Sequence, residues 1–111
     1  MAKYETIITG QFEQVVDHLE NDIRNSGVSM NLVDKSDYAS GDTNIAVRVY
    51  DKYFMRNGNR ASLSLTVVAH GRDIFISAIG AGGGQGIIFN FSLGAEEDMV
   101  SIVKQCVQRI I

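Results

Sequence analysis

The feature that most constrains the fold is a pair of adjacent segments in which apolar and polar residues alternate. The apolar members are Leu63, Leu65, Val67, Ala69, Ile74, Ile76 and Ala78. Gly71-Arg72 lies between the two segments, and glycine in the first position suits a two-residue hairpin turn. Such a turn pairs His70 with Asp73 and places every apolar member on one face. The sequence therefore predicts an antiparallel hairpin with one buried face.

A third alternating segment, residues 45–50, precedes this hairpin. A two-residue turn at Asn57-Gly58 would place the apolar residues of the two strands on opposite faces. A three-residue loop over 56–58, with Gly58 in the left-handed conformation, pairs Val49 with Leu65 and aligns the apolar sets. We therefore expect Val47 and Val49 to face the core and the even-numbered residues to face the open side of the sheet.

Two segments instead show the 3.6-residue period of an amphipathic helix: 12–23, and a segment starting near Ala95. Strands are expected at 4–9 and from Val28 to Leu32, a loop at 34–43 and a sixth strand at 87–91. The predicted order is β-α-β-β-β-β-(β)-α, an α+β fold. It has a single antiparallel sheet of five or six strands with two helices on one face. This order resembles the helix-grip or TATA-binding-protein-like arrangement.

Length and composition limit the possible classes of protein. The chain has 111 residues, a net charge of −3 and one cysteine. We expect a single domain over residues 1–111, without disulfides, in the cytoplasm. The acidic balance argues against a nucleic-acid binder, and no apolar run reaches the roughly 18 residues of a membrane helix. Neither histidine has metal-ligand spacing, so no metal or cofactor is predicted.

A stripe of alternating cations and aromatic rings is the most distinctive pattern. It comprises Arg48, Tyr50, Lys52, Phe54 and Arg56, with Arg60 expected opposite Phe54. Four cations against one acid give residues 45–69 a charge of +3, although the whole chain carries −3. Such a stripe on an open sheet face could hold a small anionic ligand or stack on bases. A solvated face and a protein interface are the alternatives.

The same face is predicted to expose an apolar patch. Its members are Tyr50, Val68, Phe75 and Ile79. A contiguous apolar patch of this kind usually marks a partner or a groove. The leading hypothesis is therefore a non-enzymatic binding or interaction module that uses the outer sheet face and forms a homodimer.

The glycine-rich segment 80–86 carries a weaker hypothesis. It fits neither a dinucleotide-binding nor a Walker pattern, and no helix is expected directly after it. Gly83, Gly84 and Gln85 could form a backbone cradle for a ligand, whereas the simpler interpretation is a bulged connection or a close backbone approach. An enzyme would have to combine this loop with Asp51, which parity places on the core side unless the strand bulges there. No catalytic residue is assigned.

Several short motifs resemble a family of uncharacterised bacterial proteins. They are residues 46–53 (AVRVYDKY), 58–60 (GNR), 77–79 (SAI) and 83–85 (GGQ). The opening five residues and residues 94–96 are also similar, so the resemblance spans most of the chain. It implies a single free-standing bacterial domain of unknown function, and it supplies no activity, substrate or catalytic residue.

Overall fold

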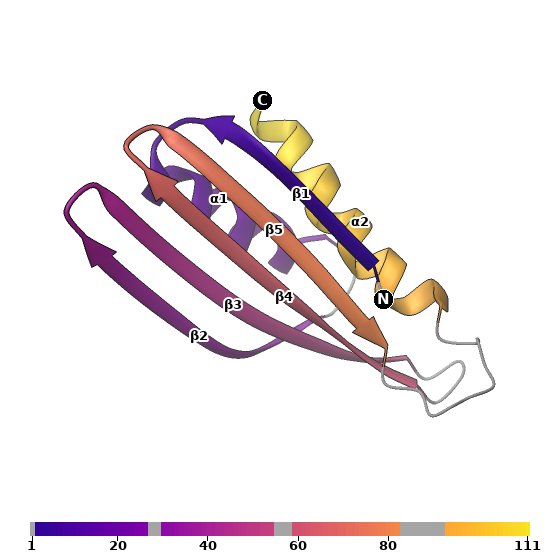
Figure 1. Ribbon diagram of the computed structural model, residues 1–111. Helices are drawn as coiled ribbons and strands as arrows, with labels where there is room; N and C mark the ends of the chain where they lie inside the picture. The colour runs from indigo at the N-terminus through magenta and orange to yellow at the C-terminus, as the bar shows by residue number, and fades with distance from the viewer. Residues whose placement is uncertain (1, 27–29, 55–58, 83–92) are drawn as a thin grey trace.

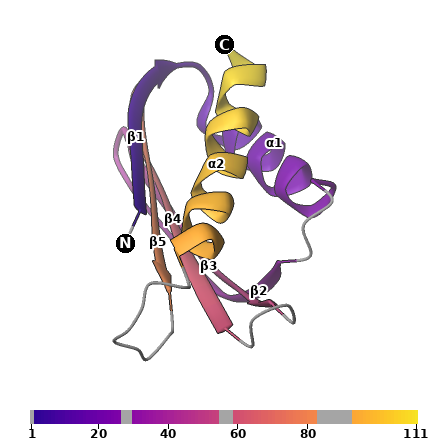
Figure 2. The same cartoon turned by 90° about the vertical axis from the view of Figure 1, so that its right-hand side faces the viewer.

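A computed structural model describes residues 2–26, 30–54, 59–82 and 93–111. It contains one five-stranded antiparallel sheet in the order β1-β5-β4-β3-β2, with both helices on the same side (Figures 1 and 2). The elements are β1 Ala2–Thr9, α1 Phe12–Arg24, β2 Asn31–Ser40, β3 Thr43–Phe54, β4 Asn59–His70, β5 Asp73–Gly82 and α2 Leu93–Ile110. The predicted α+β class and the order β-α-β-β-β-β-α are confirmed. The suggested sixth strand at 87–91 lies outside the described residues.

The β4–β5 hairpin is confirmed in its predicted register. His70 pairs with Asp73, and Gly71 takes the positive φ of 61° that a tight turn requires. Because this turn fixes the register, the inward residues of the two strands meet as predicted, with Val67 opposite Ile76. The fully buried side chains of this hairpin are Leu63, Leu65, Val67, Ala69, Ile74, Ile76 and Ala78. They form the floor of the core.

The two helices cover this floor with their apolar stripes. α1 buries Val15, Val16, Leu19 and Ile23, as its spacing predicts. α2 packs against β1, β5 and β4 and against α1 (Figure 2), and it buries Met99, Val103, Cys106 and Val107 completely. The thiol of Cys106 is thus a core group, and burial raises its pKa above the ordinary value.

Gly80 lies where α2 approaches β5 most closely. A Cβ atom at this position would stand 2.9 Å from the backbone oxygen of Glu96 and 3.0 Å from Cγ2 of Val100. The first glycine of the glycine-rich segment therefore permits close packing of a helix on a strand, one of the predicted alternatives. Gly83, Gly84 and Gln85 lie outside the described residues.

The predicted register between β3 and β4 is wrong by one residue. The pair nearest the connection is Phe54 and Asn59, so the connection has four residues instead of the predicted three. Leu65 consequently pairs with Arg48 and not with Val49. A shift of one residue sends every side chain of a strand to the opposite face. Val47 and Val49 therefore point away from the helices, and the buried residues of β3 are Ala46, Arg48 and Tyr50.

The polar segment 34–43, predicted to be a loop, instead forms most of β2 and the turn after it. β2 pairs with β3 as far as Ser40 and Thr43, with Gly41 at φ 56° in the two-residue turn. Every residue of β2 is exposed. Because neither face of β2 is deeply buried, its sequence lacks the apolar alternation by which strands are recognised.

The first turn of α1 offers a test of stability. Gln11 is the N-cap with extended dihedral angles, and its side chain makes no capping hydrogen bond. An aspartate at an N-cap accepts hydrogen bonds from the free N–H groups of the first turn. We expect Gln11→Asp to raise the free energy of unfolding by about 1 kcal/mol, measured by urea denaturation. Gln105→Asp, in the exposed middle of α2, is the control and should not stabilise.

Candidate functional site

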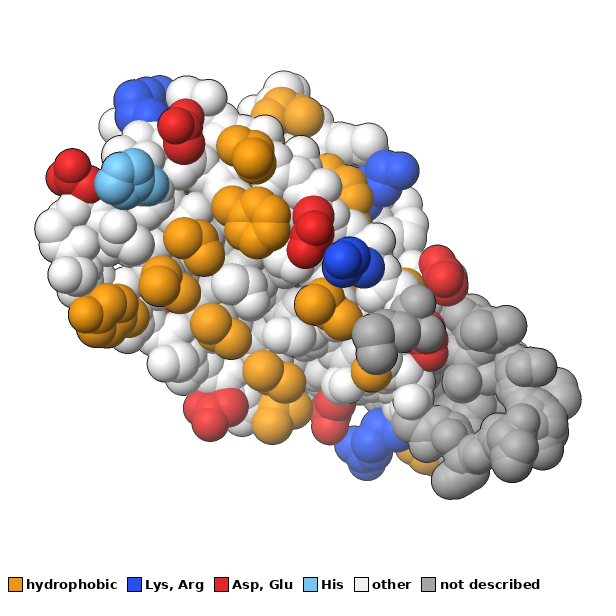
Figure 3. All heavy atoms as spheres, in the orientation of Figure 1, with side chains coloured by type: hydrophobic (Ala, Val, Ile, Leu, Met, Phe, Trp, Pro, Cys, Tyr) orange, Lys and Arg blue, Asp and Glu red, His pale blue; other side chains and the backbone are white. Residues whose placement is uncertain are grey.

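The sheet surface that faces away from the helices, here called the outer face, carries a row of large apolar side chains. The register places one member on each strand, so the row crosses the whole sheet. In spatial order its members are Ile7, Phe75, Val68, Ile45 and Tyr38. Ile7 and Tyr38, at the two ends of the row, are 69% and 63% exposed. Figure 3 shows apolar side chains gathered over this face.

Further apolar side chains extend the outer face along the strands. Val47 and Val49 follow Ile45 on β3, and Ile79 shares the cross-strand row of Val49. The rows beside the apolar one are more polar. Val47 shares its row with Glu5, Ser77, Thr66 and Ser36, and the row of Val49 and Ile79 also holds Lys3, Ser64 and Asp34. The row from Ile7 to Tyr38 is therefore apolar across all five strands, and polar residues lie beside it.

The opposite side of β3 holds a buried arginine. The side chain of Arg48 is 6% exposed and lies between α1 and the sheet. It forms an ion pair with Glu20 of α1, and its Nη1 donates to Asp37 of β2 at 2.9 Å. Nη1 also donates to the carbonyl oxygen of Val47 at 3.0 Å. Desolvation lowers the pKa of Arg48, but the bonds to both carboxylates outweigh it, so the pKa lies above its ordinary value.

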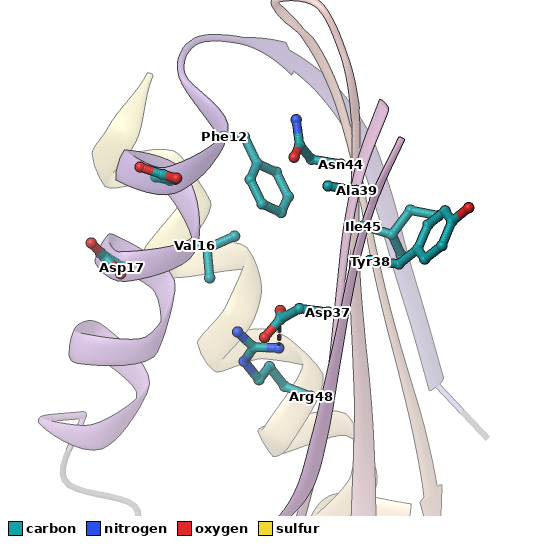
Figure 4. Close-up of a pocket in the computed structure, with 10 residues that line it drawn as sticks. Phe12, Val16, Asp17, Asp37, Tyr38, Ala39, Asn44, Ile45 and Arg48 are labelled. Atoms are coloured by element: carbon teal, nitrogen blue, oxygen red, sulfur yellow. Dashed lines mark hydrogen bonds and ion pairs between the residues drawn. The ribbon is translucent and has the colours of Figure 1, made fainter. Parts of the chain in front are cut away.

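Arg48 marks the middle of a groove between α1 and the β2–β3 part of the sheet. The first hollow, of about 470 Å³, is lined by Phe12 and Val16 of α1 and by Asp37, Asn44 and Arg48 of the sheet. In Figure 4, Phe12 and Val16 point from the helix toward the sheet, whereas Tyr38 and Ile45 lie on the far side of the strands. Arg48 thus links the helix to the floor of the groove.

A second hollow, of about 460 Å³, lies farther along α1. It is lined by Glu20, Ile23, Arg24, Met30, Asn31, Leu32, Lys35 and Tyr50. Tyr50 is 6% exposed, and within the described residues its hydroxyl has no hydrogen-bond partner. Burial, followed by the nearby charge of Glu20, raises the pKa of Tyr50. The phenol therefore stays protonated and can donate a hydrogen bond into this hollow.

The predicted stripe of cations and rings does not share one open face. Arg48 and Tyr50 lie on the helix side of the sheet, and Lys52 follows them there by parity. Arg60 pairs with Tyr53 instead of Phe54, and its guanidinium lies 5.9 Å from the centre of the Tyr53 ring. Arg56 lies outside the described residues. The prediction of a cationic outer face is therefore wrong.

Asp51 is also on the other face from the one predicted. It points outward from a strand without a bulge at this position, and its carboxylate accepts from Arg60 at 2.9 Å. A hollow of about 410 Å³ joins Asp51 to Gly82, with Arg60 and Ser62 also in its wall. Among the described lining residues, Asp51 has a guanidinium partner and no second carboxylate or histidine. This pairing does not provide the two groups that acid–base catalysis requires.

The four residues predicted to form an interface also lie on different faces of the sheet. Val68, Phe75 and Ile79 lie on the outer face, but Tyr50 lies beneath α1. Sequence reasoning missed Ile7, Ile45 and Tyr38 of the apolar row, and the two carboxylates that bind Arg48. Ile7 and Ile8 are adjacent and equally apolar, so the sequence does not show which of them faces outward. The pairing of β1 with β5 shows that it is Ile7.

The described residues show neither a membrane-spanning helix nor a metal-binding cluster. They contain no helix long and apolar enough to cross a membrane. They also contain no group of three or more His, Cys, Asp or Glu side chains placed to hold a metal ion.

Comparison with known proteins adds a family and no activity. The model of a family of unknown function, DUF6054, matches residues 1–111. No curated protein matches the chain. A similar solved structure is that of TTHA0849 from Thermus thermophilus, with 12% sequence identity and a TM-score of 0.35. The match covers 98% of this chain and 95% of that one. The expected membership of a domain-of-unknown-function family is confirmed.

Proposed function

The chain belongs to the DUF6054 family, and we propose that it is a non-enzymatic binding module that pairs with a second copy of itself through the outer face. The observation that carries this proposal is the apolar row across all five strands. Monomeric proteins rarely leave contiguous apolar surface of this extent in water. The single cysteine, fully buried, fits a reducing compartment such as the cytoplasm.

The shape of the outer face suits a second sheet. Two sheets that pack face to face keep their strands within about 30° and interdigitate the side chains of their inner faces. A row with one large side chain on each strand presents such a surface without gaps. A symmetric partner presents the same row, so apolar residues meet apolar residues on both sides.

The size of the outer face also fits a dimer. Five strands about 4.8 Å apart and the four outward rows from Ile45 to Asp51, about 6.8 Å apart, give a face of roughly 24 by 27 Å. This corresponds to about 650 Å² on each copy, close to the roughly 800 Å² per partner of a stable interface. A face of this size is large enough for specific association and small enough for a reversible dimer.

Some of the charges on the outer face are paired within the same chain, whereas Asp34 and Asp73 have no ion pair in the described residues. Asp51 binds Arg60 at 2.9 Å, and Lys3 lies 3.9 Å from Glu5. Glu5 also accepts a hydrogen bond from Ser77 at 3.2 Å. Covering the face with a second copy would leave the Asp51–Arg60 and Lys3–Glu5 pairs matched, which lowers the cost of burying them.

A lysine in the middle of the row tests the proposal. In sedimentation velocity over a concentration series, the wild-type protein should reach about twice the 12.2 kDa chain mass. Phe75→Lys and Ile45→Lys each place a charge in the apolar row and should weaken dimerisation by at least about 100-fold. Gln108→Lys adds the same charge on the exposed side of α2 and should leave the dimer intact.

Each outcome of this experiment has a definite meaning. A wild-type protein that stays monomeric at millimolar concentration rejects the homodimer. A dimer that withstands Phe75→Lys and Ile45→Lys uses another surface, which also rejects the proposal. Circular dichroism on each variant confirms that a loss of mass reflects dissociation and not unfolding.

A further inference from the structure

We propose that the hollow beneath the C-terminal half of α1 binds a small apolar carboxylic acid in its ionised form. This hollow lies on the helix side of the sheet, whereas the apolar row lies on the outer face. The proposal therefore does not depend on dimerisation. It rests on three properties of the hollow: a donor without a partner, an apolar part of the wall and two cations.

The donor is the hydroxyl of Tyr50. Tyr50 is more than nine-tenths buried and lines the hollow, and its hydroxyl has no partner in the described part of the chain. The hydroxyl oxygen is not fully enclosed, so an acceptor that enters the hollow can reach it. An acceptor inside the hollow would satisfy the hydroxyl.

The walls of the hollow combine an apolar part with the polar side chains of Glu20, Arg24, Asn31 and Lys35. Ile23 is buried on α1, Met30 comes directly before β2, and Leu32 lies at the start of β2. Leu32 is 49% exposed, more than is usual for leucine. A volume of about 460 Å³ falls within the range of small-molecule sites. The apolar part of the wall favours a ligand whose body is hydrocarbon.

The charges at the hollow select an anion. Arg24 and Lys35 line it, and neither has an ion-pair partner within the ranges that the structure describes. Nη1 of Arg24 donates only to the neutral Oδ1 of Asn21, at 2.9 Å. The one acid in the lining, Glu20, is neutralised by Arg48. The net field therefore favours a negatively charged head group.

The first hollow provides a comparison within the same groove. Three acidic residues line it (Glu13, Asp17 and Asp37), with Arg48 as its one cation among the described residues. Arg48 already binds two carboxylates, so this part of the groove has no cation to spare for an anionic ligand. A carboxylate is thus directed to the second hollow.

The probes are octanoate, octanol and octylammonium, which share one hydrocarbon chain and differ in head-group charge. Isothermal titration calorimetry of the full chain should show the tightest binding for octanoate, by about tenfold or more. Tyr50→Phe removes only the hydroxyl and should weaken octanoate binding about tenfold. Arg24→Gln with Lys35→Gln should weaken it by a similar factor. Lys104→Gln, on the exposed side of α2, is the control and should have no effect.

Several results would overturn the proposal. They are equal or tighter binding of octanol or octylammonium, undiminished octanoate binding by Tyr50→Phe, and no binding of octanoate at all. Phe75→Lys should retain octanoate binding, because Phe75 lies on the outer face. Loss of the dimer and loss of the ligand are therefore separate outcomes, and either proposal can fail alone.

Discussion

The Gly80→Ala substitution is expected to lower the free energy of unfolding by about 3 kcal/mol, a large part of the roughly 5–15 kcal/mol of a domain this size. The new methyl group would stand 2.9 Å from the backbone oxygen of Glu96. A flexible side chain could turn aside, but this obstacle is the main chain of α2. The helix must therefore move away from β5 and loosen the packing of Val100 and its neighbours.

Thermal and urea denaturation followed by circular dichroism measure this loss. Gly10→Ala is the matched control, because its methyl group would meet Val15 at 3.5 Å and Ile74 at 3.8 Å, which are ordinary contacts. Its effect should stay within about 0.5 kcal/mol. Equal stabilities of the two variants would show that α2 does not approach β5 as described.

Arg48→Met is expected to destabilise the protein by about 3 kcal/mol. Removing one partner of a buried ion pair leaves uncompensated charge, at a cost of about 3–5 kcal/mol. Glu20 and Asp37 would keep their negative charges without the guanidinium between them. The side chain of Asp37 is 55% exposed and can be hydrated, so the loss should fall at the low end of this range.

A double variant separates charge from packing. In Arg48→Met combined with Glu20→Gln, the less exposed carboxylate is neutral, so more than half of the lost stability should return. Hydrogen exchange should also show that Arg48→Met accelerates exchange in α1 while β4 and β5 stay protected, because Arg48 joins α1 to β2 and β3. A loss below about 1 kcal/mol, or uniform acceleration, would contradict this role.

The sequence predicted the fold correctly in the segments where residue periodicity and turn type allow only one arrangement. In β4 and β5 the outward residues are mostly polar and the inward ones apolar, and the two-residue turn at Gly71 pins the register. The two helices were equally clear, because their apolar stripes have a single helical period. These segments determine the fold class and contribute most of the buried core.

The prediction failed at β3, where both faces carry apolar or aromatic residues. Ile45, Val47 and Val49 are as suited to burial as Ala46 and Tyr50, so hydrophobicity does not distinguish the faces. The choice of a three-residue loop then decided the parity, and a pairing one residue away reverses it. The prediction of a cationic stripe on the outer face was wrong for the same reason, because the position of each member depended on the register of β3.

The Arg48 cluster could not be read from the sequence for a different reason. Its three charged residues, Glu20, Asp37 and Arg48, come from three separate elements, and no spacing along the chain connects them. The one available signal was a charged residue within an apolar strand, which has a partner when it faces the core. That signal indicates burial but does not identify the partners.

The two outermost strands determine how copies of this protein can meet. Within the described sheet, β2 is an edge strand, and its outer line of backbone donors and acceptors could in principle recruit another strand. Its ladder is interrupted by the bulge between Leu32 and Asp34, and it carries Lys35 and Asp37. Lys3 and Glu5 place charges of both signs on β1 at the other margin. Addition of further strands at either edge of the sheet is thus unfavourable. The copies are therefore expected to form a closed dimer and not an open-ended fibre.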